Sequence, residues 1–80
     1  MIVVKSNQIF EHTIGATVKM WRKKRGLTVT NLAKKTGFTK GYLSQLENDR
    51  IRNPNDEHMI EIAKALSIPV LHLVNRVLPS

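Results

Sequence analysis

The stretch GFTKGYLSQLENDRIRNP, residues 37–54, decides the fold. It contains a glycine, then a threonine that can cap a helix, then a segment whose spacing of apolar residues predicts a helix over residues 40–48. The apolar residues share one face of this helix and are expected to be buried. The opposite face carries the hydrogen-bonding side chains of Lys40, Ser44 and Gln45.

A second short helix is predicted immediately before this stretch, over residues 29–35, with Thr28 as its N-cap. Only residues 36–39 separate the two helices. Within them, Gly37 is expected to adopt the left-handed conformation that ends a helix, and Thr39 is expected to cap the next one. Two helices joined by a tight glycine turn form the arrangement of a helix-turn-helix.

Three further helices are predicted from apolar residues that recur three and four positions apart. The first ends at Gly26 and the last has a proline in its first turn, where proline is tolerated. The three helices are predicted over residues 14–25, with Thr13 as N-cap, over residues 56–66, with Asn55 as N-cap, and over residues 69–77, which begin with Pro69. The chain is therefore expected to be an all-α bundle of five short helices.

The chain has 80 residues, which is enough for one domain. We expect that domain to cover residues 13–78. Residues 1–12 show no helical period and are expected to form an N-terminal arm that packs on a neighbour, with a short strand or a disordered terminus as the alternatives. The sequence has no cysteine, so neither disulfides nor zinc–thiolate sites are expected to stabilise it.

Positive charge is concentrated in the middle of the chain. The net charge is +7, and residues 13–53 hold ten basic residues against Glu47 and Asp49. This segregation favours an anionic partner, namely nucleic acid, an acidic protein or a membrane surface, over an ordinary solvated surface. The longest apolar-rich run, residues 68–78, is too short to span a bilayer, so we expect a cytoplasmic protein that does not enter membranes.

No catalytic or cofactor-binding pattern is recognisable in the sequence. The three histidines, His12, His58 and His72, show no metal-ligand spacing. There is no glycine-rich phosphate loop and no nucleophile beside a base. Trp21 is interpreted as a core residue. An enzyme, a metal site and a cofactor are therefore not expected.

The order of these motifs resembles the Cro/XRE family of phage-repressor-type helix-turn-helix transcriptional regulators. The motifs GLT, LA, TG, YLSQLEN, NP and IAKAL follow one another at the spacings of that family, over residues 14–74. The resemblance implies a compact five-helix, lambda-repressor-like DNA-binding domain. Its second and third helices would form the helix-turn-helix.

The third helix is expected to read DNA bases. An α-helix fits the major groove of B-DNA, and the resemblance implies base contacts from its exposed N-terminal positions. Glutamine can pair with adenine, and lysine can donate to guanine. Gly41 departs from the family because it has no side chain, so either one base contact is missing or the backbone approaches the DNA closely. The expected base-reading residues are Lys40, Gly41, Ser44 and Gln45.

Contacts to phosphate are expected around that helix, from helix N-termini and from basic or polar side chains. The residues assigned to this role are Thr28, Thr39, Tyr42, Asn48, Arg50 and Arg52. The family usually has glutamine at the first position of the second helix, where it grips phosphate. This chain has Val29, whose side chain cannot make that contact to phosphate.

The resemblance also implies a structural ion pair between Arg22 of the first helix and Glu47 of the third. Two separately solvated charges are the alternative. If the pair is buried, removing one partner would leave an uncompensated charge and cost about 3–5 kcal/mol.

The fifth helix is more apolar than one inward stripe requires. Leu71, Val74 and Leu78 are assigned to a dimer interface, with packing of Leu71 and Leu78 on the N-terminal residues as the alternative. A dimer would place two recognition helices about 34 Å apart, in successive major grooves of a palindrome.

The hypothesis is therefore a sequence-specific, homodimeric regulator that binds a palindromic double-stranded DNA operator and acts as a repressor. The alternative is an antitoxin-like protein or a restriction–modification controller that acts through a protein partner as well as through DNA.

Overall fold

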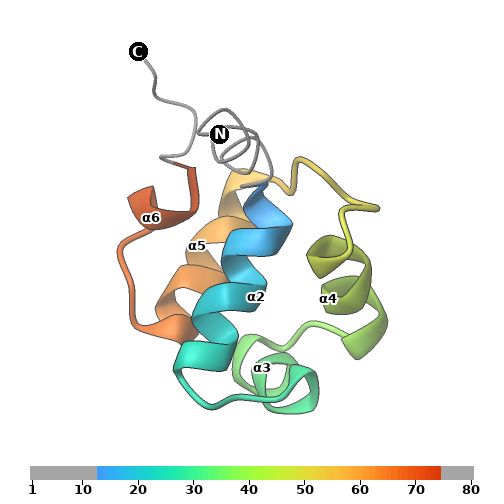
Figure 1. Cartoon of the computed structure of the whole chain (residues 1–80), viewed down its shortest axis with the longest axis vertical. Coiled ribbons are helices and arrows are strands. Elements are labelled where there is room, and N and C mark those ends of the chain that lie inside the picture. Colours follow the sequence, from blue (N-terminus) through green and yellow to red (C-terminus); the bar gives the residue numbers. More distant parts are fainter. Residues whose placement is uncertain (1–12, 75–80) are drawn as a thin grey trace, which may run out of the picture.

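Five helices make up the part of the chain that the computed structural model describes, residues 13–74 (Figure 1). Helices α2 and α5 lie side by side at the centre, with α4 and α6 on opposite sides and α3 across one end. No helix in this range is both long and apolar enough to cross a membrane. The helices are α2 (Ile14–Lys24), α3 (Val29–Thr36), α4 (Lys40–Glu47), α5 (Asp56–Leu66) and α6 (Leu71–Val74).

Four helices begin at the predicted N-caps. Thr13, Thr28, Thr39 and Asn55 each have extended backbone, and each side-chain oxygen accepts a hydrogen bond from the backbone N–H three residues later. These bonds satisfy donors that a helix otherwise leaves without a partner in its first turn. The predicted starts of α2, α3, α4 and α5 are therefore confirmed.

The turn between α3 and α4 depends on Gly37. Its φ of 86° lies in the left-handed region, and its N–H donates to the carbonyl of Ala33 at the end of α3. A residue with a Cβ would be strained in this conformation. The predicted helix–glycine turn–helix arrangement is thus present in α3 and α4.

The core contains the apolar residues that the helical period placed inward. Seven side chains are less than 2% exposed, and they come from all five helices. The fully buried set is Val18, Leu32, Leu43, Leu46, Ile62, Leu66 and Leu73. Each side chain of this kind contributes about 1.5–3 kcal/mol on burial, which is the main term that holds short helices together.

The predicted start of the last helix is wrong by two residues. Pro69 was expected inside its first turn, but α6 begins at Leu71. The N–H groups of His72 and Leu73 donate three residues back, to Pro69 and Val70, so this segment is a turn that leads into the helix. Ser67, at the end of α5, has a φ of 61°, and Ile68 is buried, so the chain changes direction before a helix can begin.

The prediction that the last helix continues to residue 77 lies outside the described residues, as do the N-terminal arm over residues 1–12 and the domain end at residue 78.

Candidate nucleic-acid interface

Helix α4 is fixed to the body of the protein by its buried face and by one ion pair. Arg22 of α2 donates to both carboxylate oxygens of Glu47, from Nε at 2.7 Å and from Nη2 at 3.0 Å. Its Nη1 also donates to the Leu27 carbonyl at 2.8 Å. The exposed fractions of Arg22 and Glu47 are only 9% and 8%. This is the pairing that the resemblance implied, and it holds α2, α4 and the loop before α3 in one arrangement.

The ion pair also affects the acid–base chemistry of Arg22. The hydrogen bond from its guanidinium to the Glu47 carboxylate, assisted by the charge attraction between them, raises the pKa of Arg22 above its ordinary value. Burial lowers the pKa of Arg22, but this effect is weaker than that of the hydrogen bond. The guanidinium therefore stays charged, and Glu47 is compensated inside the protein.

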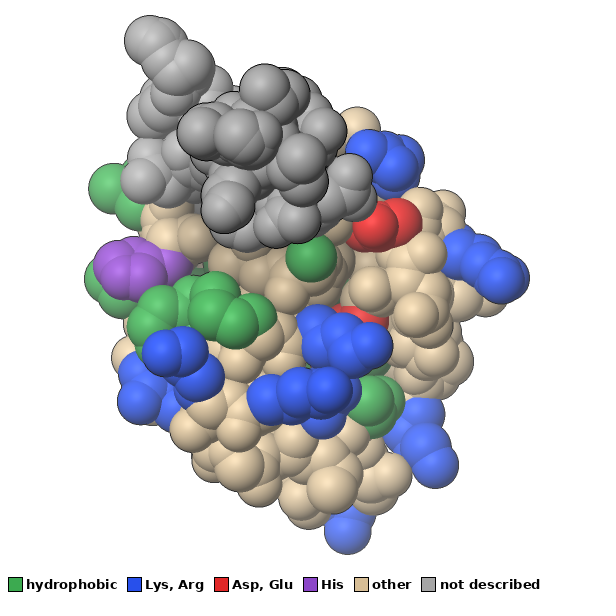
Figure 2. Space-filling model, viewed as in Figure 1, with side chains coloured by type: hydrophobic (Ala, Val, Ile, Leu, Met, Phe, Trp, Pro, Cys, Tyr) green, Lys and Arg blue, Asp and Glu red, His purple; other side chains and the backbone are tan. Residues whose placement is uncertain are grey.

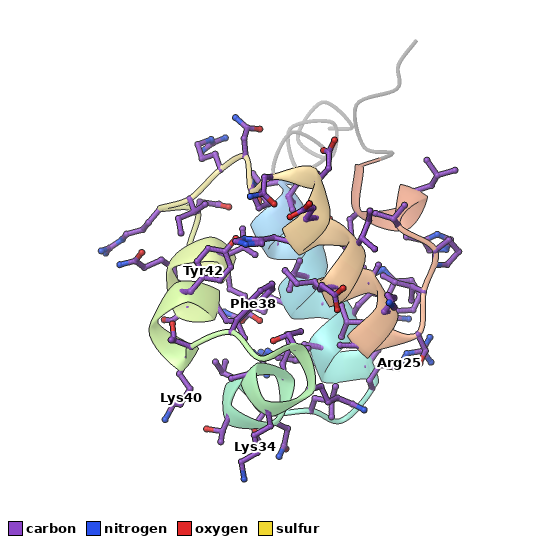
Figure 3. All side chains as sticks on the ribbon, turned by 180° about the vertical axis from the view of Figure 1, so that it is seen from behind. Arg25, Lys34, Phe38, Lys40 and Tyr42 are labelled. Atoms are coloured by element: carbon purple, nitrogen blue, oxygen red, sulfur yellow. The ribbon has the colours of Figure 1, made fainter. Side chains whose placement is uncertain are left out.

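The outward face of α4 contains all four residues predicted to read bases. Lys40, Gly41, Ser44 and Gln45 are exposed. Figure 3 shows Lys40, and Lys34 on α3, directed away from the body of the protein. A Cβ built on Gly41 would meet only Thr39 Oγ1, at 4.0 Å, so the fold itself does not require glycine there.

The two threonines predicted to bind phosphate differ in how their hydroxyl groups are used. Thr39 Oγ1 accepts from the Tyr42 N–H at 3.0 Å, and a hydroxyl that accepts can still donate its own proton. Thr28 Oγ1 accepts from the Asn31 N–H and donates to Asn31 Oδ1 at 2.9 Å. The hydroxyl proton of Thr28 is therefore engaged within the cap of α3. In the cap of α4, the hydroxyl proton of Thr39 remains available for another acceptor.

Tyr42, also predicted to bind phosphate, is half-buried between α4 and α5. Its hydroxyl lies 2.8 Å from Nδ1 of His58, and Phe38 packs edge-on against its ring. Burial raises the pKa of Tyr42 above its ordinary value. Sequence reasoning missed His58 as a neighbour of this residue, because the only signal is a histidine in the first turn of a helix far along the chain.

The loop after α4 folds back onto the end of that helix. The carbonyl of Gln45 accepts from the N–H groups of Arg50 at 2.8 Å and Ile51 at 3.3 Å. Ile51 is half-buried against the core, whereas Arg50 and Arg52 are exposed. Asn48 ends the helix, and its side-chain amide donates to the Ser44 carbonyl.

Basic side chains outnumber acidic ones on the surface of this part of the chain, as the space-filling view shows for one face (Figure 2). Of the ten basic residues between positions 13 and 53, only Arg22 is buried. Two of the lysines, Lys34 and Lys40, also border a shallow groove between α3 and α4, together with Phe38. The exposed basic residues are Lys19, Lys23, Lys24, Arg25, Lys34, Lys35, Lys40, Arg50 and Arg52.

One of these charges has a structural function that the sequence did not reveal. Arg25 donates from Nε to the Leu66 carbonyl at 2.8 Å and from Nη2 to the Ser67 carbonyl at 3.2 Å. Its guanidinium also lies over the Trp21 ring, 5.3 Å from the centroid. Arg25 therefore satisfies the C-terminal carbonyls of α5, a position where a cation suits the helix dipole.

The residues predicted to form a dimer interface are only partly described. Leu71 is 65% exposed on α6, the most exposed large apolar side chain of the described residues. The backbone of Val74 ends α6, but its side chain and the whole of Leu78 lie outside the described part.

Comparison with known proteins places this geometry in a family. The family model described as helix-turn-helix matches residues 18–73, which include the whole of α3, the glycine turn and α4. The chain belongs to the Cro/XRE helix-turn-helix family. The motifs that carried the resemblance, from GLT to IAKAL, lie within the matched range. The family and its relatives are transcriptional regulators and not enzymes.

Three similar proteins define this relationship. The regulator SinR of Bacillus licheniformis is 34% identical over 62 residues, which cover 78% of this chain and 56% of that protein. The immunity repressor of Bacillus phage phi105 is 39% identical over 62 residues, 78% of this chain and 42% of the repressor. This chain thus spans only about half the length of these relatives. A crystal structure of SinR in complex with DNA superposes with a TM-score of 0.75 at 32% identity, covering 78% of this chain and 98% of that one.

Proposed function

We propose that this chain binds double-stranded DNA sequence-specifically, as a transcriptional repressor that works as a dimer. The observation that carries the proposal is the outward face of α4, where Lys40, Gly41, Ser44 and Gln45 are exposed together on a helix whose opposite face is fixed in the core. Its fold is that of a SinR structure that contains DNA, and the relatives include a phage repressor.

In the proposed complex, α4 enters the major groove. Gln45 pairs with adenine through its amide, and Lys40 donates to guanine O6 or N7, which are the pairings that these side chains form with base edges. Gly41 lets the helix backbone approach the DNA closely, since no packing requirement within the protein explains the glycine. Ser44 supplies a further donor or acceptor on the same face.

Phosphate contacts set the position of this helix in the groove. Thr39 retains a hydroxyl proton that it can donate, and it lies at the N-terminus of α4, where the positive end of the helix dipole favours a phosphate. Arg50 and Arg52 supply positive charge from the loop, which is tied to α4 through the Gln45 carbonyl. Tyr42 and Asn48 flank the groove. Thr28 contributes its position at the start of α3 more than its hydroxyl, which Asn31 already engages.

The proposed dimer forms through α6, with the exposed Leu71 as part of its interface. Two copies of α4 would then read the half-sites of a palindromic operator, and bound protein would exclude polymerase from a promoter. A domain with this few residues gains both affinity and specificity when two copies bind one site.

Selection from a library of random duplexes at near-physiological salt tests this function. The expected result is an enriched inverted repeat whose half-sites are about one helical turn apart. Retention of duplexes without an enriched motif would mean that the basic surface binds only the DNA backbone, and it would overturn the proposed sequence specificity. Salt must be held constant, since the contribution of phosphates falls steeply as salt rises.

A further inference from the structure

A cluster of three rings links the helix-turn-helix to α5 beside the proposed interface. The Tyr42 hydroxyl lies 2.8 Å from His58 Nδ1, and their ring centroids are 5.2 Å apart in an edge-to-face arrangement. Phe38, from the turn before α4, lies 5.3 Å from the Tyr42 ring and 4.6 Å from the His58 ring. Figure 3 shows Phe38 and Tyr42 beside one another on the inner side of α4. The phenol is therefore held in one orientation, one turn of helix from Ser44 and Gln45.

The protonation of His58 determines what the Tyr42 hydroxyl can do. A phenol has one proton to donate. If His58 carries its only proton on Nε2, then Nδ1 is an acceptor and Tyr42 donates to it. If Nδ1 carries a proton, as it always does in the imidazolium, His58 donates to the Tyr42 oxygen, and the Tyr42 proton is free to bond elsewhere. Because burial raises the pKa of Tyr42, the phenol keeps this proton throughout the range in which an imidazole titrates.

We propose that His58 is a positioning residue for a contact between Tyr42 and a DNA phosphate, and that DNA binding is coupled to proton uptake by His58. This inference rests on the proposed DNA-binding function and deepens it. A phosphate oxygen only accepts hydrogen bonds, so it can use Tyr42 only when the Tyr42 proton is released from His58. Affinity for DNA therefore rises as the pH falls, because the imidazolium always carries a proton on Nδ1, whereas the neutral ring does so in only one of its two tautomers.

Charged groups lie around this cluster on α5 and on the neighbouring elements. Phe38 and Tyr42, which contact the His58 ring, are uncharged near neutral pH. On α5 itself, His58 lies in the first turn, among acidic side chains and at the positive end of the helix dipole. Those carboxylates are Asp56, Glu57 and Glu61, the last of them 3.9 Å from Lys64. Among the elements packed against α5, α2 and its C-cap carry Lys19, Lys23, Lys24, Arg25 and the Arg22 that pairs with Glu47, α3 carries Lys34 and Lys35, and α6 carries His72. The cation Lys40 lies on α4, and Arg50 and Arg52 lie on the loop that follows it. Bound DNA would bring negative charge to these cations and so favour the protonated histidine.

A double-mutant cycle measured at two pH values tests the coupling. Binding of a random-sequence duplex, which reports phosphate contacts, is measured at fixed salt about one pH unit below and above the ordinary imidazole value of ~6.5. The chains compared are the wild type, Tyr42→Phe, His58→Gln and the double variant. Tyr42→Phe removes the hydroxyl and keeps the ring, and glutamine at position 58 can donate or accept but does not titrate.

The expected result is that Tyr42→Phe weakens binding more at the lower pH, by a further factor of about 2–10, which is the net effect of one hydrogen bond. In the His58→Gln background the loss should be the same at both pH values. An equal loss at both pH values in the wild-type background, or a pH-dependent loss that persists in His58→Gln, would overturn the inference.

Two controls distinguish titration of His58 from titration of another histidine and from loss of the fold. The first control is His72→Gln, which changes a histidine on α6 whose ring lies against Trp21 of α2. This variant should keep the pH dependence of DNA binding, whereas His58→Gln alone should remove most of it. The comparison of these two variants shows whether His58 is responsible even if Tyr42→Phe does not fold. The second control is thermal unfolding at each pH, which shows whether each variant is folded. Failure of the wild type to bind any duplex would overturn the proposed function as well, while binding with a pH-independent contribution from Tyr42 would overturn only the role of His58.

Discussion

Gly15 in the first turn of α2 lies directly against the backbone carbonyl of Leu46 in the last turn of α4. A Cβ at Gly15 would overlap that carbonyl oxygen and would lie 2.8 Å from Oδ1 of Asp49. Thr13 donates from its hydroxyl to the same Asp49 oxygen at 2.7 Å. Helix α4, the proposed recognition helix, is therefore attached to α2 at two places. The close contact at Gly15 lies near the start of α2, and the Arg22–Glu47 ion pair lies near its end.

Replacing Gly15 by alanine is expected to lower the free energy of unfolding by about 1–3 kcal/mol, because the overlapping atoms belong to the backbone of α4 and cannot turn away. Gly41→Ala is the matched control. It adds the same methyl group to a position with open space, inside a helix where alanine is favoured by about 1 kcal/mol, so it should stabilise the protein. Urea unfolding followed by the fluorescence of Trp21, the only tryptophan, measures both. Equal changes in the two variants would contradict the close contact.

Removing one partner of the buried ion pair should destabilise the protein strongly. Glu47→Leu leaves the Arg22 guanidinium buried without a countercharge, and Arg22→Met leaves the Glu47 carboxylate in the same situation, each with an expected cost of about 3–5 kcal/mol. The double variant Arg22→Met, Glu47→Leu should cost less than either single change, because it removes both charges and restores apolar packing. Thermal unfolding of the three variants measures this. A double variant as unstable as the sum of the single changes would show that the two residues act independently.

The hydroxyl of Tyr42 should make the stability of the protein depend on pH in the alkaline range. Burial raises its pKa above the ordinary 10.0, so the folded chain binds this proton more tightly than the unfolded chain. The resulting stabilisation is complete below the unfolded-state pKa and is lost as the pH rises through the folded-state pKa. Tyr42 is the only tyrosine, so tyrosinate absorbance reports its titration alone, in folded and in urea-unfolded chains. A folded-state midpoint at or below the unfolded one would contradict the prediction, and Tyr42→Phe controls for lysine titration.

Base-reading and phosphate-binding residues should differ in how they affect DNA binding. Gln45→Ala is expected to cost about 1–3 kcal/mol on the selected sequence and to relax the preference at one base pair. Arg50→Ala should weaken all duplexes to a similar extent and lower the salt slope by about one. Fluorescence anisotropy with selected and scrambled duplexes at several salt concentrations separates the two. If Gln45→Ala reduced binding to both duplexes equally, a base-reading role for Gln45 would be wrong.

Leu71→Glu should convert the proposed dimer to a monomer without unfolding it. The side chain is 65% exposed, so a charge there is solvated in the monomer but would be buried without a partner in an interface through α6. Sedimentation equilibrium gives the mass, and the unfolding temperature gives the stability. Ile60→Glu, at another exposed apolar position on α5, is the control and should leave the mass unchanged. A Leu71→Glu protein that remained dimeric would place the interface elsewhere.

Local rules predicted the helix-turn-helix well because short-range interactions determine it. The side chains of Thr28 and Thr39 bond to N–H groups three residues away, and Gly37 can take a left-handed conformation whatever surrounds it. The start of α6 was predicted less well. Proline is compatible with a helix start but does not require one, and the turn at Ser67 and the burial of Ile68, which depend on α5 and the core, decided where Pro69 lies.

The sequence by itself determined the order of the helices, their caps, their buried faces and the exposed face of α4, because each depends on residues within one or two helical turns. Only the tertiary structure decided the contacts between distant segments. It placed Gly15 against Leu46, joined Arg25 to the end of α5 and brought His58 to the hydroxyl of Tyr42. These pairs are separated by 16 to 41 residues, so no local pattern links them, and the packing of the helices around a common core brings them together.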